Sequence, residues 1–424
     1  MASRAAAAEA PALAFARMAE LSAALGESPA LLALREQARA QLQPLQLPHR
    51  ARHLWRYTDP ALFVPTSDPT MVEPPTAPPE WRLDEPHAAA ALLAGGMLHS
   101  VELSDSARAA GVEVEDLHRA SAEGLGALVG SEHGFLEAIN ATAWRSGVLV
   151  RVPAGVTLTE PIRLRLVAGT LTLPRVLVIG GEGSSFEVLE GHVGGGQGAR
   201  VLSVSEIFVA ENANVRYGLV QRWEPGVVGH VTARAKVAAG ARFQMSLASF
   251  GGATYKADVG ALLAGEGAEA ETYGVAMGGD LQQFDHHTEH LHLAPKTHSN
   301  LDFKVALTHA ARSAYTGMIR IAPGAGGSEA YQVNRNLLLS ADARAESIPE
   351  LEILTDDVRC SHGATVAPLD PEQLFYLESR GLARLQAMRV IVYGFLGQTL
   401  ARLPQSTRER IEAMVAERLH TERS

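Results

Sequence analysis

A short turn of small and polar residues recurs through the middle of the chain at nearly constant spacing. Each turn is followed by one or two small residues and then by a stretch of alternating apolar and polar residues. The last residues of successive turns lie 28, 29, 28 and 27 positions apart, at Gly155, Gly183, Asn212, Gly240 and Gly267. The alternating stretches begin at Val156, Phe186, Val215 and Phe243. Short strands joined by corners at a fixed period are typical of a coil that stacks on itself. The repeat therefore predicts a mainly β fold, a β-helix or related β-solenoid.

Two other architectures fit the repeat less well. A propeller blade needs about 40 residues, which is longer than the spacing of these turns. A doubly wound sheet needs helices between its strands, and no helical pattern separates the strands here. The solenoid remains the simplest interpretation.

Helical patterns precede the repeat. One helix is expected over about 11–25, and Ser28 and Pro29 supply the N-cap and the first residue of a second helix. Downstream of these helices, Trp55 and Tyr57 lie in a basic and aromatic run. Two interpretations of these aromatic residues stay open: they anchor the helices onto the body, or they form a docking surface.

Helical patterns also follow the repeat. Asp370 is the expected N-cap of a short helix, and a longer helix is expected over about 382–403. Ser406 and Glu409 have the spacing of a capping box for the last helix. We divide the chain into an N-terminal helical region (1–64), a linker and mixed region (65–147), a β-helix core (148–368) and a C-terminal helical domain (369–424).

Composition narrows the class of protein. The formal net charge of −10 disfavours a nucleic-acid-binding surface and is ordinary for a cytoplasmic protein. No run of about 18 apolar residues predicts a membrane-spanning helix. The N-terminus lacks the apolar core of a signal peptide, so we expect it to belong to the mature protein. The chain has one cysteine, which excludes an internal disulfide and a four-thiolate cluster built from this chain alone.

That cysteine, Cys360, lies two positions before His362. In an extended strand both side chains would point to the same face. A thiol beside an imidazole suits iron, copper or zinc, but the pair is only half of a tetrahedral site, so further ligands must come from elsewhere. The same pair also fits a buried cysteine that acts as a small apolar residue next to a hydrogen-bonded histidine.

A second candidate site is a group of histidines between His286 and His309. With nearby acidic residues the group has the composition of a metal site, but it has no HExxH motif and an HxH pair is a weak signal. Hydrogen-bonded histidines inside a coil are the alternative. The six members are His286, His287, His290, His292, His298 and His309.

Three runs of the sequence resemble one known family. They are WRYTD at 55–59, SEAYQVNRNLLLSADARAESIPELE at 328–352 and DDVRCSHGATVAPLDPEQLFYLESRGL at 356–382. Together they resemble the SufB/SufD family of iron–sulfur cluster assembly scaffolds, most densely over 148–394. SufB-like chains carry a cysteine near the position of Arg335 here, so the resemblance is to the SufD branch.

The resemblance implies a right-handed parallel β-helix and a non-catalytic scaffold subunit. It implies a heterodimer with a SufB-like paralogue through the β-helix, and a SufC-like ATPase bound at the C-terminal helical domain. A transient iron–sulfur cluster, or iron, would be shared with the partner at their interface, with His362 and Cys360 as ligands from this chain. For the isolated chain, a homodimer is an alternative that the sequence leaves open. The absence of a P-loop motif agrees with ATP hydrolysis by the partner.

A polysaccharide lyase or hydrolase is the alternative function, because such enzymes also use β-solenoids. It would need carboxylates gathered on one face, and Glu350 and Glu352 together with Asp356 and Asp357 are the candidates. Adjacent residues of a strand face opposite ways, so Asp356 and Asp357 cannot both line one cleft.

Overall fold

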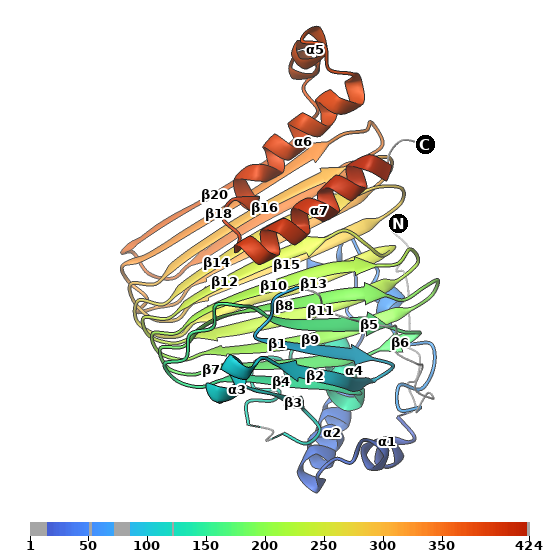
Figure 1. Ribbon diagram of the computed structural model, residues 1–424, viewed down its shortest axis with the longest axis vertical. Coiled ribbons are helices and arrows are strands. Elements are labelled where there is room, and N and C mark those ends of the chain that lie inside the picture. The colour runs from blue at the N-terminus through green and yellow to red at the C-terminus, as the bar shows by residue number, and fades with distance from the viewer. Residues whose placement is uncertain (1–14, 51–52, 72–84, 121–122, 422–424) are drawn as a thin grey trace, which may run out of the picture.

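The computed structural model describes residues 15–50, 53–71, 85–120 and 123–421 (Figure 1). Its body is a parallel β-solenoid made of two ten-stranded sheets, with helices at both ends. This confirms the predicted fold class. From β7 onward, successive strands alternate between the sheets, so neighbours within a sheet are one coil apart and run parallel.

The two sheets are named A and B here. In spatial order, sheet A contains β2 (Met97–Leu103), β1 (Ala89–Ala94), β5 (Ile162–Ala168), β8 (Ser185–Gly194), β10 (Asn214–Trp223), β12 (Arg242–Ser249), β14 (Glu269–Gly278), β16 (His298–Leu307), β18 (Ser328–Leu338) and β20 (Val358–Pro368). Sheet B contains β19 (Arg344–Ile353), β17 (Arg312–Ile321), β15 (Gln283–His292), β13 (Thr254–Leu263), β11 (Val228–Val237), β9 (Arg200–Val209), β7 (Pro174–Gly180), β4 (Ser146–Val152) and β3 (Glu113–Asp116), with β6 (Leu171–Thr172) beside β9. Both sheets include strands that lie before residue 148, since β1 pairs with β5 and β3 pairs with β4.

The turns that the sequence repeat predicted form a column along one side of the coil. The four glycines that end these turns have φ angles between 61° and 70°, and Asn212 has a φ angle of 57°. Glycine adopts this left-handed conformation at little cost, and asparagine tolerates it better than most residues do. The amide of Gly183 donates to the carbonyl of Glu211 in the next turn at 2.9 Å, so the column is hydrogen-bonded from coil to coil.

A second column of turns closes the opposite side of the coil, and the sequence analysis did not predict it. Its left-handed residues are of mixed type, which hides the repeat in the sequence. They are Gly198, Gly226, Gly252, Asp280 and His309.

Three of the four predicted strand starts lie in strands, and the fourth, at Val156, is wrong. β5 begins only at Ile162, and Thr157 forms a single isolated bridge with Ser185. Pro161 lacks an amide hydrogen, so the hydrogen-bond ladder of β5 starts after it.

Helices cover the outward faces of the sheets. α6 (Arg384–Leu400) and α7 (Gln405–Thr421) cross sheet A (Figure 1), where Leu396 and Ile411 pack with Val220. α2 (Pro29–Leu42) and α4 (Phe135–Ala143) cover part of sheet B, where Leu136 packs with Leu177. The shorter helices are α1 (Met18–Leu25), η1 (His53–Trp55), η2 (Pro60–Phe63), α3 (Asp105–Ala109) and α5 (Pro371–Ser379). Among the described residues, none of the helices combines the length and apolarity that crossing a bilayer requires.

Two of the three predicted helix caps are confirmed. The side chains of Ser28 and Asp370 each accept a hydrogen bond from the first turn of their helices. The capping box predicted for the last helix is wrong. Ser406 lies inside α7, and its hydroxyl donates to Glu187 on β8 at 2.6 Å, so a contact with the sheet replaces the local cap.

The turn column yields a test of the fold. A Cβ added at Gly240 would lie 2.6 Å from Asn212 Oδ1, and the φ angle of +61° is strained for any other residue. Gly240→Ala should lower the free energy of unfolding by about 1–3 kcal/mol, measured by urea titration. Gly196→Ala is the matched control, since nothing lies within 4 Å of its added Cβ, and it should change stability by less than about 0.5 kcal/mol. Equal effects of the two variants would contradict this account of the turns.

Candidate functional site

The last coil of the solenoid is exposed, unlike the coils before it. Most side chains of β19 and β20 are exposed or half-buried, whereas those of β16 and β17 are mostly buried. β20 is bonded to β18 on one side, and within the described part of the chain no strand pairs with its other edge. A solenoid end with free backbone groups requires a cap or a partner.

Cys360 and His362 both lie on this terminal strand. In the parallel register Cys360 is opposite Ala330 and His362 is opposite Gln332 on β18. Because side chains alternate along a strand, the thiol and the imidazole share one face of β20. His362 is exposed, whereas Cys360 is partly buried against an apolar cluster that includes Leu301.

The environment of Cys360 favours the neutral thiol. Burial raises its pKa above the usual 9.0, although a backbone hydrogen bond to Ala330 opposes that effect. The thiolate is the form that binds metals, so binding at this position would have to displace the proton. In the described ranges, no three His, Cys, Asp or Glu side chains are grouped to hold a metal ion. Within the described residues, Cys360 and His362 therefore do not make up a complete metal site by themselves.

The histidine group is divided by the geometry of β15. His286, His290 and His292 point into the solenoid and are fully buried, whereas His287 points outward. His298 lies on β16, and His309 lies in the second column of turns.

The three inward histidines are hydrogen-bonded to hydroxyl groups of neighbouring coils. His286 Nε2 lies 2.9 Å from Ser249 Oγ, and His290 Nε2 lies 3.0 Å from Thr272 Oγ1. Burial lowers the pKa of His286 and His290 to about 3 and that of His292 to about 4, so all three are neutral at physiological pH. This arrangement matches hydrogen-bonded core histidines rather than a metal centre.

Near the open end the interior of the coil becomes polar, a feature that the sequence analysis missed. Gln332, Asn334 and Asn336 occupy alternate positions of β18 and are all buried. The Asn336 amide donates to Asn334 Oδ1 at 2.7 Å, whereas Gln332 Oε1 and Asn336 Oδ1 have no hydrogen-bond partner within the described chain. The alternation of amide residues at these positions was visible in the sequence and could have indicated a polar interior.

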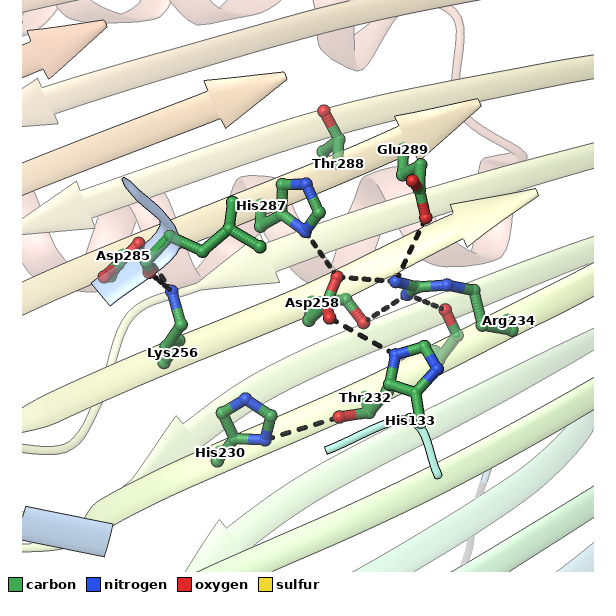
Figure 2. A network of polar contacts seen from close by, with 12 residues as sticks. His133, His230, Thr232, Arg234, Lys256, Asp258, Asp285, His287, Thr288 and Glu289 are labelled. Carbon is green, nitrogen blue, oxygen red and sulfur yellow. Dashed lines mark hydrogen bonds and ion pairs between the residues drawn. The ribbon is translucent and has the colours of Figure 1, made fainter. Parts of the chain in front are cut away.

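A second polar assembly lies on the outward face of sheet B, and the sequence analysis missed it too. Figure 2 shows Asp258 at its centre, with dashed contacts to Arg234, His287 and His133. Asp258 Oδ1 lies 2.8 Å from Arg234 Nη2 and 2.6 Å from His287 Nδ1, and Asp258 Oδ2 lies 3.5 Å from His133 Nε2. Burial would raise the pKa of Asp258, but the charges of Arg234 and His287 hold it well below the usual range.

The N-terminal segment is fixed beside this network. Trp55 stacks on His230, with 5.8 Å between the ring centroids. Lys256 Nζ lies 3.0 Å from Asp285 Oδ1 and donates to the carbonyl of Leu54 at 2.8 Å. Of the two interpretations of this segment, the contacts of Trp55 support the anchor.

Comparison with known proteins agrees with this architecture. The family model for the SUF system FeS cluster assembly SufBD core domain matches residues 164–395. This match spans more than half of the chain and includes Cys360 and His362. The chain belongs to the SufBD family.

Several SufBD relatives show how far the similarity extends. Iron–sulfur cluster assembly SufBD family proteins of Mycobacterium leprae and Mycobacterium tuberculosis are 33% identical over 260 residues and 36% identical over 202 residues. These matches cover 60% and 48% of this chain but only 30% and 24% of the relatives. A SufBD family protein of Staphylococcus epidermidis is 29% identical over 297 residues, 69% of this chain and 63% of the relative. The chain therefore spans less than two thirds of each of these relatives.

The Asp258 network predicts a dependence of stability on pH. Burial and the charge of Arg234 lower the pKa of His133, but the hydrogen bond to Asp258 and the charges of Asp258 and Glu137 outweigh them and raise it above 6.5. A raised pKa in the folded state means that His133 stabilises the fold fully below about pH 6.5 and loses this contribution as the pH rises through the folded-state pKa.

We therefore expect His133→Gln to destabilise the protein more at pH 6 than at pH 9, as measured by urea unfolding at both values. His99→Gln is the control, because it removes a histidine of β2 that lies outside the network. A difference between wild type and His133→Gln that is constant across this range would contradict the assignment.

Proposed function

We propose that this chain is a SufD-type scaffold subunit that supports iron–sulfur cluster assembly and has no catalytic activity of its own. It would act in a SufBCD-like complex with a SufB-like paralogue and a SufC-like ATPase. Membership of the SufBD family supports a role in iron–sulfur cluster assembly. The observation that carries the proposal is the exposed terminal strand β20 with Cys360 and His362 on one face.

The partner of β20 would be the end of a second solenoid. An exposed strand edge accepts another strand through its free backbone groups. Exposed apolar side chains beside this edge also favour burial by a partner: Ile353 is 40%, Leu354 44% and Val366 44% exposed. A SufB-like chain docked here would form the heterodimer, and in its absence a second copy of this chain would form a homodimer.

The nascent iron–sulfur cluster, or iron, is the cargo of this interface. Cys360 and His362 would supply a thiolate and an imidazole, and the partner would complete the coordination shell. Arg335, at the place of the SufB-type cysteine, projects from the exposed face of β18 and supplies no thiol. This supports assignment to the SufD branch.

The C-terminal helices would bind the ATPase. α5 stands beyond the last strands at the top of Figure 1. Its side chains Phe375 and Tyr376 are 72% and 56% exposed, and Val390 of α6 is 50% exposed. Aromatic residues exposed on a helix that projects from the body are typical of a docking surface. ATP hydrolysis would belong to the partner, because this chain lacks a P-loop sequence.

We place this activity in the cytoplasm, where a single cysteine stays reduced. The acidic net charge argues against nucleic acid as a partner. The contacts also disfavour a polysaccharide lyase or hydrolase. Glu350 lies 3.1 Å from His53 and Glu352 lies 3.4 Å from Arg320, so these carboxylates serve local ion pairs rather than a shared cleft.

The cluster-site assignment predicts the effect of removing the imidazole. His362→Ala should leave the complex assembled and lower cluster formation by about tenfold or more. Loss of a residue that only hydrogen-bonds to a metal ligand already costs about 10- to 100-fold in metal affinity, and loss of a ligand should cost at least as much. The measurement is anaerobic reconstitution of the co-expressed complex, followed by absorbance and iron content. His99→Ala, on the opposite edge strand of sheet A, is the control. Unchanged cluster yield in His362→Ala would remove this residue from the site.

The edge-pairing assignment predicts a separate effect on assembly. Val366→Glu places a carboxylate beside the free edge of β20 and should weaken binding to the SufB-like partner by about tenfold or more, because burying an unpaired charge costs at least about 1.4 kcal/mol. Pull-down and native mass spectrometry measure this. Leu281→Glu is the control, since Leu281 is 84% exposed in a turn between β14 and β15. Equal recovery of the partner with both variants would place the interface elsewhere.

A further inference from the structure

One buried amide side chain near the open end of the solenoid has an acceptor atom without a donor. Gln332 of β18 is fully buried, and its Oε1 has no hydrogen-bond partner within the described residues. A buried acceptor that lacks a donor destabilises a fold, so most such atoms in proteins are paired. The place of Gln332 next to the last coil indicates which donor it meets.

The strand register places Gln332 next to His362. Leu301 of β16, Gln332 of β18 and His362 of β20 are successive register partners in sheet A. Leu301 and Gln332 are buried and point into the solenoid, and side chains of register partners point to the same face. His362 continues this column on the terminal strand, where its imidazole is exposed.

The amide group of Gln332 is held in place from the opposite sheet. Its Nε2 donates to the carbonyl of Gly317 on β17 at 3.2 Å. A Cβ added at Gly317 would clash with this nitrogen, so glycine at this position leaves room for the amide. A carbonyl oxygen accepts from the amide nitrogen and not from the amide oxygen. The Gly317 carbonyl therefore fixes which side of the amide faces it and leaves Oε1 without a donor.

Two hydroxyl groups of the last coils do not satisfy this oxygen. The hydroxyl of Tyr315, which lies beside Gly317, is hydrogen-bonded to Thr288 at 2.8 Å. Ser347 of β19 is the register partner of Tyr315, and its buried hydroxyl also has no partner within the described chain, so it does not reach Gln332. The imidazole N–H of His362, which faces the same way as Gln332, is the donor that fits.

We propose that Gln332 is a positioning residue for His362, and that its Oε1 accepts a hydrogen bond from one ring nitrogen when a partner covers the last coil. This inference rests on the function proposed above, because the partner excludes water from the exposed imidazole. Histidines that bind metals typically donate their other N–H to a fixed acceptor, which sets the tautomer and the orientation of the ring. Gln332 thus keeps the second ring nitrogen unprotonated and available to iron.

Assembly of the complex would satisfy two groups through this one bond. The buried acceptor of Gln332 gains a donor, and the imidazole, which loses its contact with water, gains an acceptor. A partner that left His362 in water would provide neither gain. The bond therefore links correct docking to the form of His362 that binds a metal.

The test is nitrogen-15 NMR of the imidazoles in the metal-free complex, co-expressed with its partner and labelled with nitrogen-15 histidine in this chain alone. The signal lost in His362→Ala identifies His362. We expect a single tautomer in the wild-type complex and a mixture of both in Gln332→Met, which has a similar shape but lacks the acceptor. Binding of Fe²⁺ to this variant should weaken by about tenfold or more, since loss of such an acceptor costs about 10- to 100-fold in metal affinity.

Asn336→Leu is the matched control. Asn336 is a buried amide on the same face of β18, and its Nδ2 donates to the carbonyl of Thr365 on β20 at 3.2 Å. Its register partner is Val366, whose side chain has no donor. A purely structural effect on β20 would therefore appear in Asn336→Leu as strongly as in Gln332→Met, whereas a positioning effect would appear only in Gln332→Met.

An unchanged tautomer in Gln332→Met, or an equal change in Asn336→Leu, would overturn the role of Gln332. Native mass spectrometry verifies that each variant assembles. Should Gln332→Met not assemble, Gln332→Glu, which keeps an acceptor oxygen, should give the single tautomer, and a mixture there would also overturn the role. Failure of the proposed function is a different result, because it would appear as Fe²⁺ binding that His362→Ala leaves unchanged.

Discussion

The parallel hydrogen-bond ladder between successive coils is the interaction on which this structure depends. Each strand satisfies its backbone groups through the coils on either side, and the turns are bonded in the same way. Such a ladder propagates without an intrinsic end, so its first and last strands must be terminated by other means. The way in which the strands at each end are terminated therefore indicates which end of the solenoid is open to binding by another molecule.

The two ends of the solenoid differ. At the N-terminal end the parallel order gives way to antiparallel strands, with β2 closing sheet A and the four-residue β3 closing sheet B. At the C-terminal end the parallel order continues to β19 and β20, whose side chains are largely exposed. The only cysteine of the chain lies on that open strand. The unpaired strand edge and the cysteine therefore lie at the same end of the solenoid, and under the function proposed above one partner would cover the edge and complete the ligands.

Polar side chains on the outward faces hold the flanking segments to the coil. On sheet B the buried charges of Asp258 and Arg234 neutralise each other beside the N-terminal segment (Figure 2). On sheet A, Glu187 fixes the start of α7, and arginines from the sheet and α7 line the groove between them. Removing one member of such a buried pair is costly because it leaves its partner charged and unsolvated. The helices are therefore fixed by specific electrostatic contacts as well as by apolar packing.

The sequence by itself determined the coil, because its signals are local. A left-handed turn favours glycine or asparagine, and alternation defines a strand, so in the first column of turns both recur visibly at a fixed period. The three family motifs were equally readable. Only the tertiary structure decided which histidines are buried, because this depends on which of the alternating side chains of β15 point into the solenoid. It also brought His133 to Asp258 and Ser406 to Glu187, since residues far apart in the chain become neighbours only when coils stack and helices fold back onto them.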